Sequence, residues 1–238
     1  MVLEEDIVIS IKDLSLEYSV FQRSGVFSTG KKTVIKALDG ISMDIRRGEN
    51  IAILGANGAG KSTLLGAIGG SLRPSSGEIT TKGRVFTLKG ANPGLVNTMT
   101  PRENVRILSE VYGVPKENRG DFEREVEDFC ELGEAFDRKQ STLSSGMAGR
   151  VGFGFTTSLK PEILLMDETL GVGDEHFRKK ATQKAIDFME KGETIVLSTH
   201  SLNLAKNMCK RGIVLIEGRM AFAGSSEEAV KFYLESIE

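Results

Sequence analysis

The residues best suited to chemistry form a glycine-rich stretch, Gly55–Ser62, with the spacing Gly-x-x-x-x-Gly-Lys-Ser. The apolar run Ile51–Leu54 precedes it and a helix-like segment follows it, which is the setting of a phosphate-binding loop. Glycines let successive N–H groups point at one phosphate, and the following helix adds a partial positive charge. The loop predicts nucleotide binding by Gly55, Ala56, Asn57, Gly58, Ala59, Gly60, Lys61, Ser62 and Thr63.

Two side chains of this loop have predicted roles of their own. Lys61 is expected to reach the β and γ phosphates, and the Ser62 hydroxyl is expected to bind Mg²⁺. The alternative is a glycine-rich turn that contains an unrelated lysine.

An acidic pair, Asp167 and Glu168, follows the apolar run Ile163–Met166, which predicts a strand buried on both faces of a parallel sheet. Such sheets bind ligands at the carboxyl ends of their strands. Asp167 is therefore expected to hold Mg²⁺, and Glu168 to orient and polarise the attacking water. His200 follows another apolar run and is expected to reach the γ-phosphate. The competing interpretations are an acidic loop and a structural histidine.

Apolar patterns also predict the elements that position these residues. Strands are expected at residues 7–18, 34–38, 41–45, 51–54, 85–88, 163–166, 195–197 and 213–216 and around Ile79, with a polar interruption at 19–32. Helices are expected from Thr100, with Glu103 completing a capping box, and at 122–133, 176–191 and from Ser225 or Ser226 onward. Cys130 is expected to be a small core residue.

Composition limits the function classes. The chain has 238 residues and a net charge of −2, which argues against nucleic-acid binding. Its two cysteines, Cys130 and Cys209, are too few for a disulfide framework. No apolar run is long enough to cross a bilayer, and the acidic N-terminus lacks the layout of a signal peptide. We therefore expect no direct membrane insertion, so that any membrane contact is made through a partner.

The loop Leu143–Met147, Leu-Ser-Ser-Gly-Met, adds a third motif, in which Ser144 is expected to cap a helix. With the other motifs in this order, nearly the whole chain resembles the ATPase subunits of ABC transporters. The resemblance matches Gly55–Ser62 to the Walker A loop, Ile163–Glu168 to the Walker B strand, His200 to the switch histidine, and Ser144, Ser145 and Gly146 to the signature loop. Tyr18 lies where this family stacks an aromatic on adenine, although Phe21 and Phe27 lie in the same stretch.

The resemblance implies an α/β fold: a P-loop NTPase (RecA-like) core with an antiparallel β portion and an inserted α-helical subdomain. We expect one domain over residues 1–238, with the core at 1–92 and 160–238 and the helical subdomain at 93–159. The family usually has a glutamine after the strand near Val85–Leu88, and this chain has none there.

The residues of the signature loop and of Gly171–Phe177 resemble those of the family branch that exports polysaccharides, lipid-linked glycans or teichoic acids. The implied function is ATP hydrolysis that powers such export, with ATP and Mg²⁺ as cofactors. The implied partners are a second copy, packed head-to-tail around ATP, and an integral-membrane permease at the cytoplasmic face of the cell membrane. The alternatives are export of a drug or peptide, and a soluble ABC-type ATPase that acts on nucleic acid. A P-loop GTPase is disfavoured because the chain lacks an Asn-Lys-x-Asp motif.

Overall fold

The computed structural model describes residues 6–22, 31–89, 94–167 and 174–237. The chain divides into two compact units. The split unit comprises Met1–Gly83 and Thr194–Glu238, and the central unit comprises Arg84–Glu193. The subdomain boundaries expected from the sequence, 93 and 159, stay a prediction.

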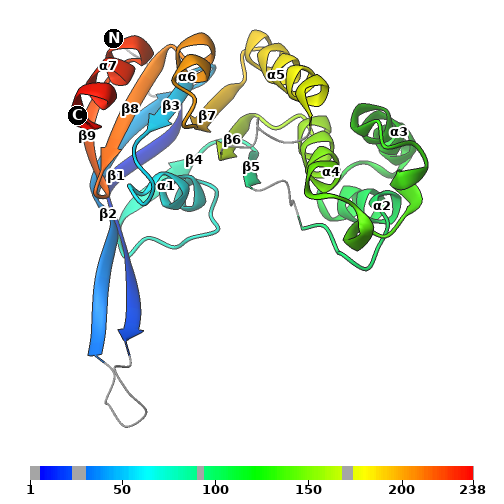
Figure 1. The fold of residues 1–238 in the computed structure, drawn as a ribbon, viewed down its shortest axis with the longest axis horizontal. Helices are drawn as coiled ribbons and strands as arrows, with labels where there is room; N and C mark the ends of the chain where they lie inside the picture. The colour runs from blue at the N-terminus through cyan, green and yellow to red at the C-terminus, as the bar shows by residue number, and fades with distance from the viewer. Residues whose placement is uncertain (1–5, 23–30, 90–93, 168–173, 238) are drawn as a thin grey trace. The chain divides into compact units, whose positions relative to one another are not determined.

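An antiparallel sheet in the split unit has the strand order β2-β1-β4, formed by β1 (Ile7–Gln22), β2 (Lys31–Arg46) and β4 (Ser76–Thr81). Figure 1 shows β1 and β2 as a long hairpin, in blue. Alternate residues of β1, among them Ile9 and Ile11, are buried. The expected interruption at 19–32 is wrong at its two ends, because the backbone pairs Ser19 with Val34 and Gln22 with Lys31. The pairs between β1 and β4 end at Ser15. Past Ser15, β1 pairs only with β2 among the described residues, so its backbone pairing there does not require alternating apolar residues.

The second sheet of the split unit has the order β7-β3-β8-β9. Parallel β3 (Asn50–Leu54), β7 (Thr194–Ser198) and β8 (Arg211–Ile216) confirm three predicted strands, and β9 (Arg219–Ser225) pairs antiparallel with β8. Helix α1 (Lys61–Ile68) follows β3, α6 (Leu202–Met208) follows β7, and α7 (Ser226–Ile237) packs on β8. The sequence did not predict β9 or α6. In β9, half-buried and exposed residues alternate, so its apolar pattern is weak.

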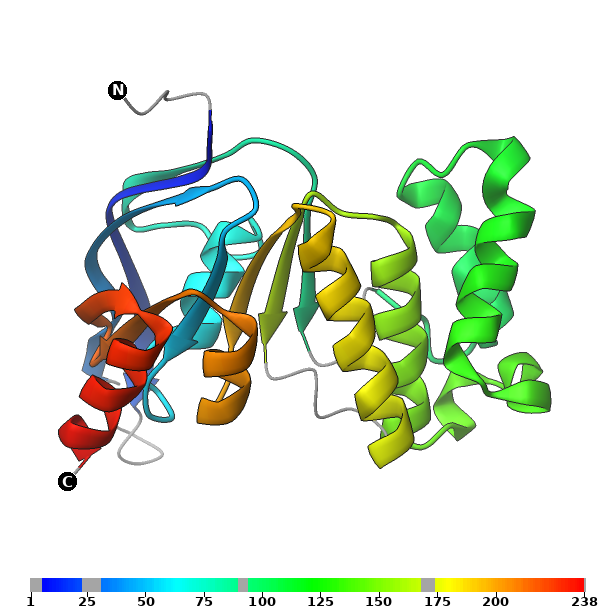
Figure 2. The same cartoon turned by 90° about the horizontal axis from the view of Figure 1, so that it is seen from above.

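In the central unit, β5 (Val85–Lys89) pairs in parallel with β6 (Ile163–Asp167). The helices are α2 (Pro101–Val111), α3 (Arg119–Cys130), α4 (Ser145–Ser158) and α5 (Glu175–Glu190), with short 3₁₀ segments at Lys116–Asn118, Gly133–Asp137 and Gln140–Thr142. In Figure 2, α4 and α5 lie side by side. The second predicted helix ends at Cys130, and Gly133 belongs to the 3₁₀ segment that follows.

The core of the central unit lies between α2, α3 and α4 and includes Val105, Val126, Phe136 and Phe155. Cys130 belongs to this core, as predicted, and burial raises the pKa of its thiol far above the usual range. The thiol is therefore a packed, protonated group rather than a nucleophile.

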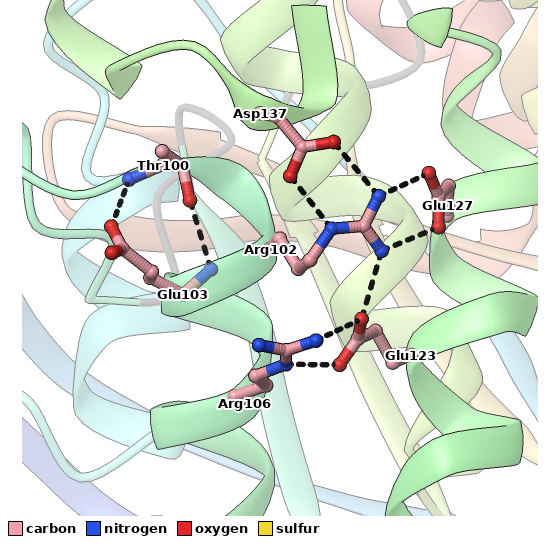
Figure 3. A network of polar contacts seen from close by, with 7 residues as sticks. All are labelled: Thr100, Arg102, Glu103, Arg106, Glu123, Glu127 and Asp137. Atoms are coloured by element: carbon pink, nitrogen blue, oxygen red, sulfur yellow. Dashed lines mark hydrogen bonds and ion pairs between the residues drawn. The ribbon is translucent and has the colours of Figure 1, made fainter. Parts of the chain in front are cut away.

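The start of α2 confirms the predicted capping box. Thr100 Oγ1 accepts the Glu103 N–H over 3.1 Å, and the Thr100 N–H donates to Glu103 Oε2 over 2.8 Å. Two backbone N–H groups at the start of α2 are thereby satisfied by side chains. Figure 3 shows this box beside the side chain of Arg102.

Arg102 joins α2 to α3 and to the 3₁₀ segment after it (Figure 3). Its guanidinium contacts Glu123 at 2.8 Å, Glu127 at 2.6 Å and Asp137 at 2.7 Å. The hydrogen bonds that Arg102 donates to Asp137, Glu127 and Glu123 raise the pKa of its guanidinium well above its usual range. Burial opposes ionisation of Glu123, but the hydrogen bonds from Arg106 and Arg102 outweigh it and lower its pKa. The network therefore holds three segments together through charged hydrogen bonds.

Candidate functional site

The loop Gly55–Ser62 connects the buried strand β3 to α1. Gly60 caps α1 in the left-handed region, with φ +105°, and no side chain of the described residues caps this helix. A Cβ on Gly60 would lie 2.7 Å from the Ala37 oxygen and 2.9 Å from Leu38 Cδ2. Backbone conformation and close packing thus both require glycine here. A helix N-terminus of this kind favours a bound anion.

Lys61 is turned back onto this loop. Its ammonium donates to the Gly55 oxygen over 2.8 Å and to the Ala56 oxygen over 3.1 Å, and the residue is only 6% exposed. The positive charge is therefore held within the curve of the loop by two backbone carbonyls. Ala56, Asn57, Gly58 and Ser62 are exposed, while Gly55, Ala59 and Gly60 are buried and Thr63 is half-buried.

This geometry fits a polyphosphate. It combines exposed loop residues, a helix N-terminus with no side-chain cap among the described residues, and a desolvated ammonium, and all three favour anionic oxygens. Ser62 lies in the first turn of α1, where its hydroxyl oxygen could bind a Mg²⁺ that is also bound by phosphate. Among the residues that the structure describes, no three His, Cys, Asp or Glu side chains form a metal cluster.

His200 and the loop share one edge of the sheet in the split unit. Strands β3 and β7 are parallel neighbours, with Ile53 opposite Ser198, and each strand ends within two residues of the predicted site. His200 is exposed and directly precedes Ser201, the N-cap of α6. The predicted arrangement, with strand ends gathered on one side, is thus present for these two motifs.

Tyr18 lies on β1, opposite Ile35 of β2, and is 40% exposed. Its ring is open to a partner, and Ile35 and Val34 beside it are also about half exposed, at 50% and 51%. The backbone of Phe21 pairs with Lys32, and Phe27 lies outside the described residues. Tyr18 as the adenine-stacking residue stays a prediction.

Two predicted motifs lie in the central unit. Asp167 is the last residue of β6, opposite Lys89, and is half-buried. Glu168 lies outside the described residues. The Asp167 carboxylate thus has the strand-end placement that a metal ligand needs, and its role stays a prediction.

The predicted signature loop opens α4. Ser144 caps this helix, accepting the Met147 N–H over 3.2 Å, which confirms the predicted cap. Ser144 and Ser145 are exposed and Gly146 is half-buried. The positive end of the α4 dipole therefore faces outward from the central unit, where it can meet an anion.

Sequence reasoning missed two features that touch these motifs. The Gly218 N–H donates to the Ala59 oxygen over 3.1 Å, so the β8–β9 turn contacts the phosphate-binding loop. In the central unit, Arg150 of α4 donates to Asp174 over 2.7 Å. No sequence motif links residues 217–219 to the phosphate-binding loop, and no local pattern links Arg150 to Asp174.

Comparison with known proteins decides the family. Residues 38–171, more than half of the chain, match the family model described as "ABC transporter". The chain belongs to the ABC transporter family. This membership makes it a nucleotide-binding protein and supports ATP hydrolysis.

Relatives and solved structures agree with this assignment. The chain is 35% identical to the O-antigen export system ATP-binding protein RfbB of Klebsiella pneumoniae, over 95% of this chain and 90% of that protein. It is 31% identical to the teichoic acids export ATP-binding protein TagH of Listeria monocytogenes, over 98% of this chain and 72% of that protein. The ATP-binding cassette MJ0796, solved as a post-hydrolysis dimer with ADP and Pi, has 25% identity and a TM-score of 0.75, covering 92% of this chain and 98% of that one. The predicted P-loop α/β fold is confirmed.

Proposed function

We propose that this chain is the ATP-hydrolysing subunit of an exporter that moves a polysaccharide or lipid-linked glycan across the cytoplasmic membrane. The observation that carries the proposal is the match to an O-antigen export ATP-binding protein over nearly the full length of both chains. The match to a teichoic acids export protein supports the same substrate class. One relative is named for O-antigen export and the other for teichoic acids export.

In this proposal Gly55–Thr63 binds the phosphates of ATP through backbone N–H groups, and Lys61 leaves its two carbonyl partners for the β and γ phosphates. Ser62 and Asp167 hold Mg²⁺, which neutralises phosphate charge when bound. Glu168 orients the attacking water and His200 donates to the γ-phosphate. Each of these groups would stabilise the negative charge that develops on the γ-phosphate as it is transferred to water.

A second copy completes the site in this proposal. Ser144, Ser145 and Gly146 of the second copy meet the γ-phosphate, using the exposed N-terminus of its α4. The dimeric state named for the cassette MJ0796 supports this assembly. A membrane-embedded permease is the other proposed partner, because the relatives are named as ATP-binding proteins of export systems. The chain would then sit on the cytoplasmic face as a peripheral subunit.

Glu168→Gln tests the hydrolytic role. We expect ATP binding to persist while hydrolysis falls by about 10²–10⁴-fold, the range for losing a positioned general base. The matched control is Glu190→Gln, an exposed carboxylate at the end of α5, which should hydrolyse ATP normally. Normal turnover in Glu168→Gln would remove that residue from its proposed role.

Two experiments test the assembly and the substrate. A bulky residue at Gly146 should preserve ATP binding but abolish ATP-dependent dimerisation, and retained dimers would contradict the shared site. Co-purification with a membrane permease, followed by analysis of what accumulates in a deletion strain, tests glycan export. Accumulation of a peptide or drug in place of a glycan would redirect the substrate assignment.

A further inference from the structure

We propose that the β8–β9 turn, Glu217–Arg219, is a brace that positions the phosphate-binding loop, with Gly218 as its central positioning residue. The proposal rests on the nucleotide site proposed above and adds residues outside the four motifs. A brace here means a segment that touches no nucleotide but fixes the backbone that does.

The turn touches the loop directly. The Gly218 N–H donates to the Ala59 oxygen over 3.1 Å, and Ala59 is only 6% exposed. A Cβ built on Gly60 would lie 3.6 Å from Gly218 Cα, so the two backbones are in contact. This hydrogen bond fixes the peptide just before Gly60, whose left-handed conformation starts α1.

Strand β8, which leads into the turn, supports the other end of the loop. A Cβ on Gly55 would lie only 2.5 Å from the Leu215 oxygen and 3.0 Å from Ala59 Cβ. The loop thus rests on the β8–β9 hairpin at both its first and its later residues. Its exposed middle, residues 56–58, borders a cavity of about 210 Å³ whose lining includes Ile216, Glu217 and Tyr233. The middle of the loop therefore borders open space, and the hairpin contacts at Gly55 and Ala59 are the ones that fix its backbone.

The far side of the turn is held by β2. The Asp39 N–H donates to the Gly218 oxygen over 2.9 Å. A Cβ on Gly218 would lie 2.7 Å from the Ala37 oxygen and 3.2 Å from Leu38 Cα. Gly218 also has φ +78°, so close packing and backbone conformation both require glycine. The turn is therefore clamped between β2 and the phosphate-binding loop.

An ion pair fastens the turn to β2. Arg219 donates to Asp39 Oδ2 from Nη2 over 2.6 Å and from Nε over 3.0 Å. The Asp39 side chain is 22% exposed and the Arg219 side chain 73% exposed. Hydrogen bonds from Arg219 lower the pKa of Asp39 despite partial burial. At neutral pH this pair is charged and can hold the turn in its register.

Gly218→Ala is the first test, with Gly192→Ala as its matched control. Both glycines have φ +78°, but a Cβ on Gly192 would meet nothing within 4 Å. The two variants therefore share the backbone strain, and only Gly218→Ala displaces the turn. We expect titration of the full chain with a fluorescent ATP analogue to give a dissociation constant about tenfold higher for Gly218→Ala than for the wild type. This is about the effect of losing one hydrogen bond, here the one from Gly218 to Ala59. Gly192→Ala should bind as the wild type does.

A second pair of variants removes the ion pair between Asp39 and Arg219 without introducing a steric clash. Asp39→Asn and Arg219→Gln should each weaken analogue binding severalfold while the melting temperature without nucleotide stays close to that of the wild type. The double variant should bind no more weakly than Asp39→Asn, since Arg219→Gln removes only the contact with Asp39; Asp39 also accepts from Lys36 over 3.4 Å. This pair decides the question if Gly218→Ala does not fold.

The outcomes separate the two proposals. Wild-type affinity in Asp39→Asn and Arg219→Gln, together with wild-type affinity in a folded Gly218→Ala, would overturn the brace and leave the nucleotide site intact. Failure of the wild-type chain to bind the analogue would overturn the nucleotide site itself. Lower affinity in the variants with an unchanged control supports the brace.

Discussion

Arg150 and Asp174 link α4 to α5 across 24 residues of sequence: Arg150 Nη2 donates to Asp174 Oδ2 over 2.7 Å. The other oxygen of the same carboxylate accepts the Phe177 N–H over 2.9 Å, which makes Asp174 the N-cap of α5. The Arg150 guanidinium also lies over the Phe177 ring, 4.9 Å from its centroid. One carboxylate thus caps one helix and holds the side chain of another.

These two tasks of Asp174 can be separated by substitution. Asn caps a helix about as well as Asp, so Asp174→Asn should keep the cap and lose only the ion pair. We expect Asp174→Asn to leave the free energy of unfolding almost unchanged, because the carboxylate is exposed, and Asp174→Ala to lower it measurably through the lost cap. Urea unfolding measures both values. Equal costs for the two variants would show that the cap contributes nothing.

The capping box of α2 gives a second prediction. Thr100→Ala removes the hydroxyl that accepts the Glu103 N–H and should destabilise α2 by about 1 kcal/mol. Thr100→Ser keeps that oxygen and serves as the control. Amide hydrogen exchange at the first turn of α2 should accelerate in the Ala variant alone. Unchanged exchange in that variant would contradict the prediction.

The Arg102 network gives a third prediction. Arg102→Met should destabilise the central unit by about 1–3 kcal/mol, because three carboxylates lose a charged donor. Arg102→Lys should recover only part of this loss, since one ammonium cannot reproduce the planar fork that meets Glu127 and Asp137. Hydrogen exchange of α3 measures the effect within this unit. Full recovery by lysine would show that charge alone matters.

The same network predicts a dependence on pH. The pKa of Glu123 is lowered because the hydrogen bonds from Arg106 and Arg102 outweigh burial, and the hydrogen bond from Arg102 lowers the pKa of Asp137. The unfolded chain therefore binds these protons first as the pH falls. The stabilisation is complete above the ordinary carboxyl range, about pH 4, and is lost as the pH falls through the lowered values. Unfolding of Arg102→Met should depend less steeply on pH below about 4 than unfolding of the wild type.

Motifs and caps could be predicted from sequence because they act over a few residues. Thr100 and Glu103 are three positions apart, and Ser144 accepts from Met147 at the same spacing. The strand before Gly55 and the helix after Lys61 follow from apolar content and glycine spacing. Local chemistry is thus sufficient for the phosphate-binding loop and for the start of α4.

Contacts between distant segments could not be predicted in the same way. Gly218 and Ala59 meet only because β8 lies beside β3, and this pairing leaves no mark near either residue. Arg102 has its partners 21, 25 and 35 positions away in the sequence. Strand β9 was missed because one of its faces is exposed, which dilutes the apolar pattern. These features depend on contacts between distant segments, and such contacts leave no local pattern in a single sequence.

Lys61 gives the last prediction. Lys61→Met keeps the length and the apolar stem of the side chain in its 6%-exposed position but removes the ammonium that meets the Gly55 and Ala56 oxygens. Since a charged hydrogen bond contributes about 1.5–3 kcal/mol, the affinity for the ATP analogue should fall by about 10–100-fold. The control is Lys206→Met, which removes an exposed charge in α6 and should leave binding unchanged. Circular dichroism should show both variants folded, because the carbonyls that Lys61 leaves lie beside exposed loop residues where water can replace it. Unaltered affinity in folded Lys61→Met would mean that the phosphates are held by the backbone N–H groups alone.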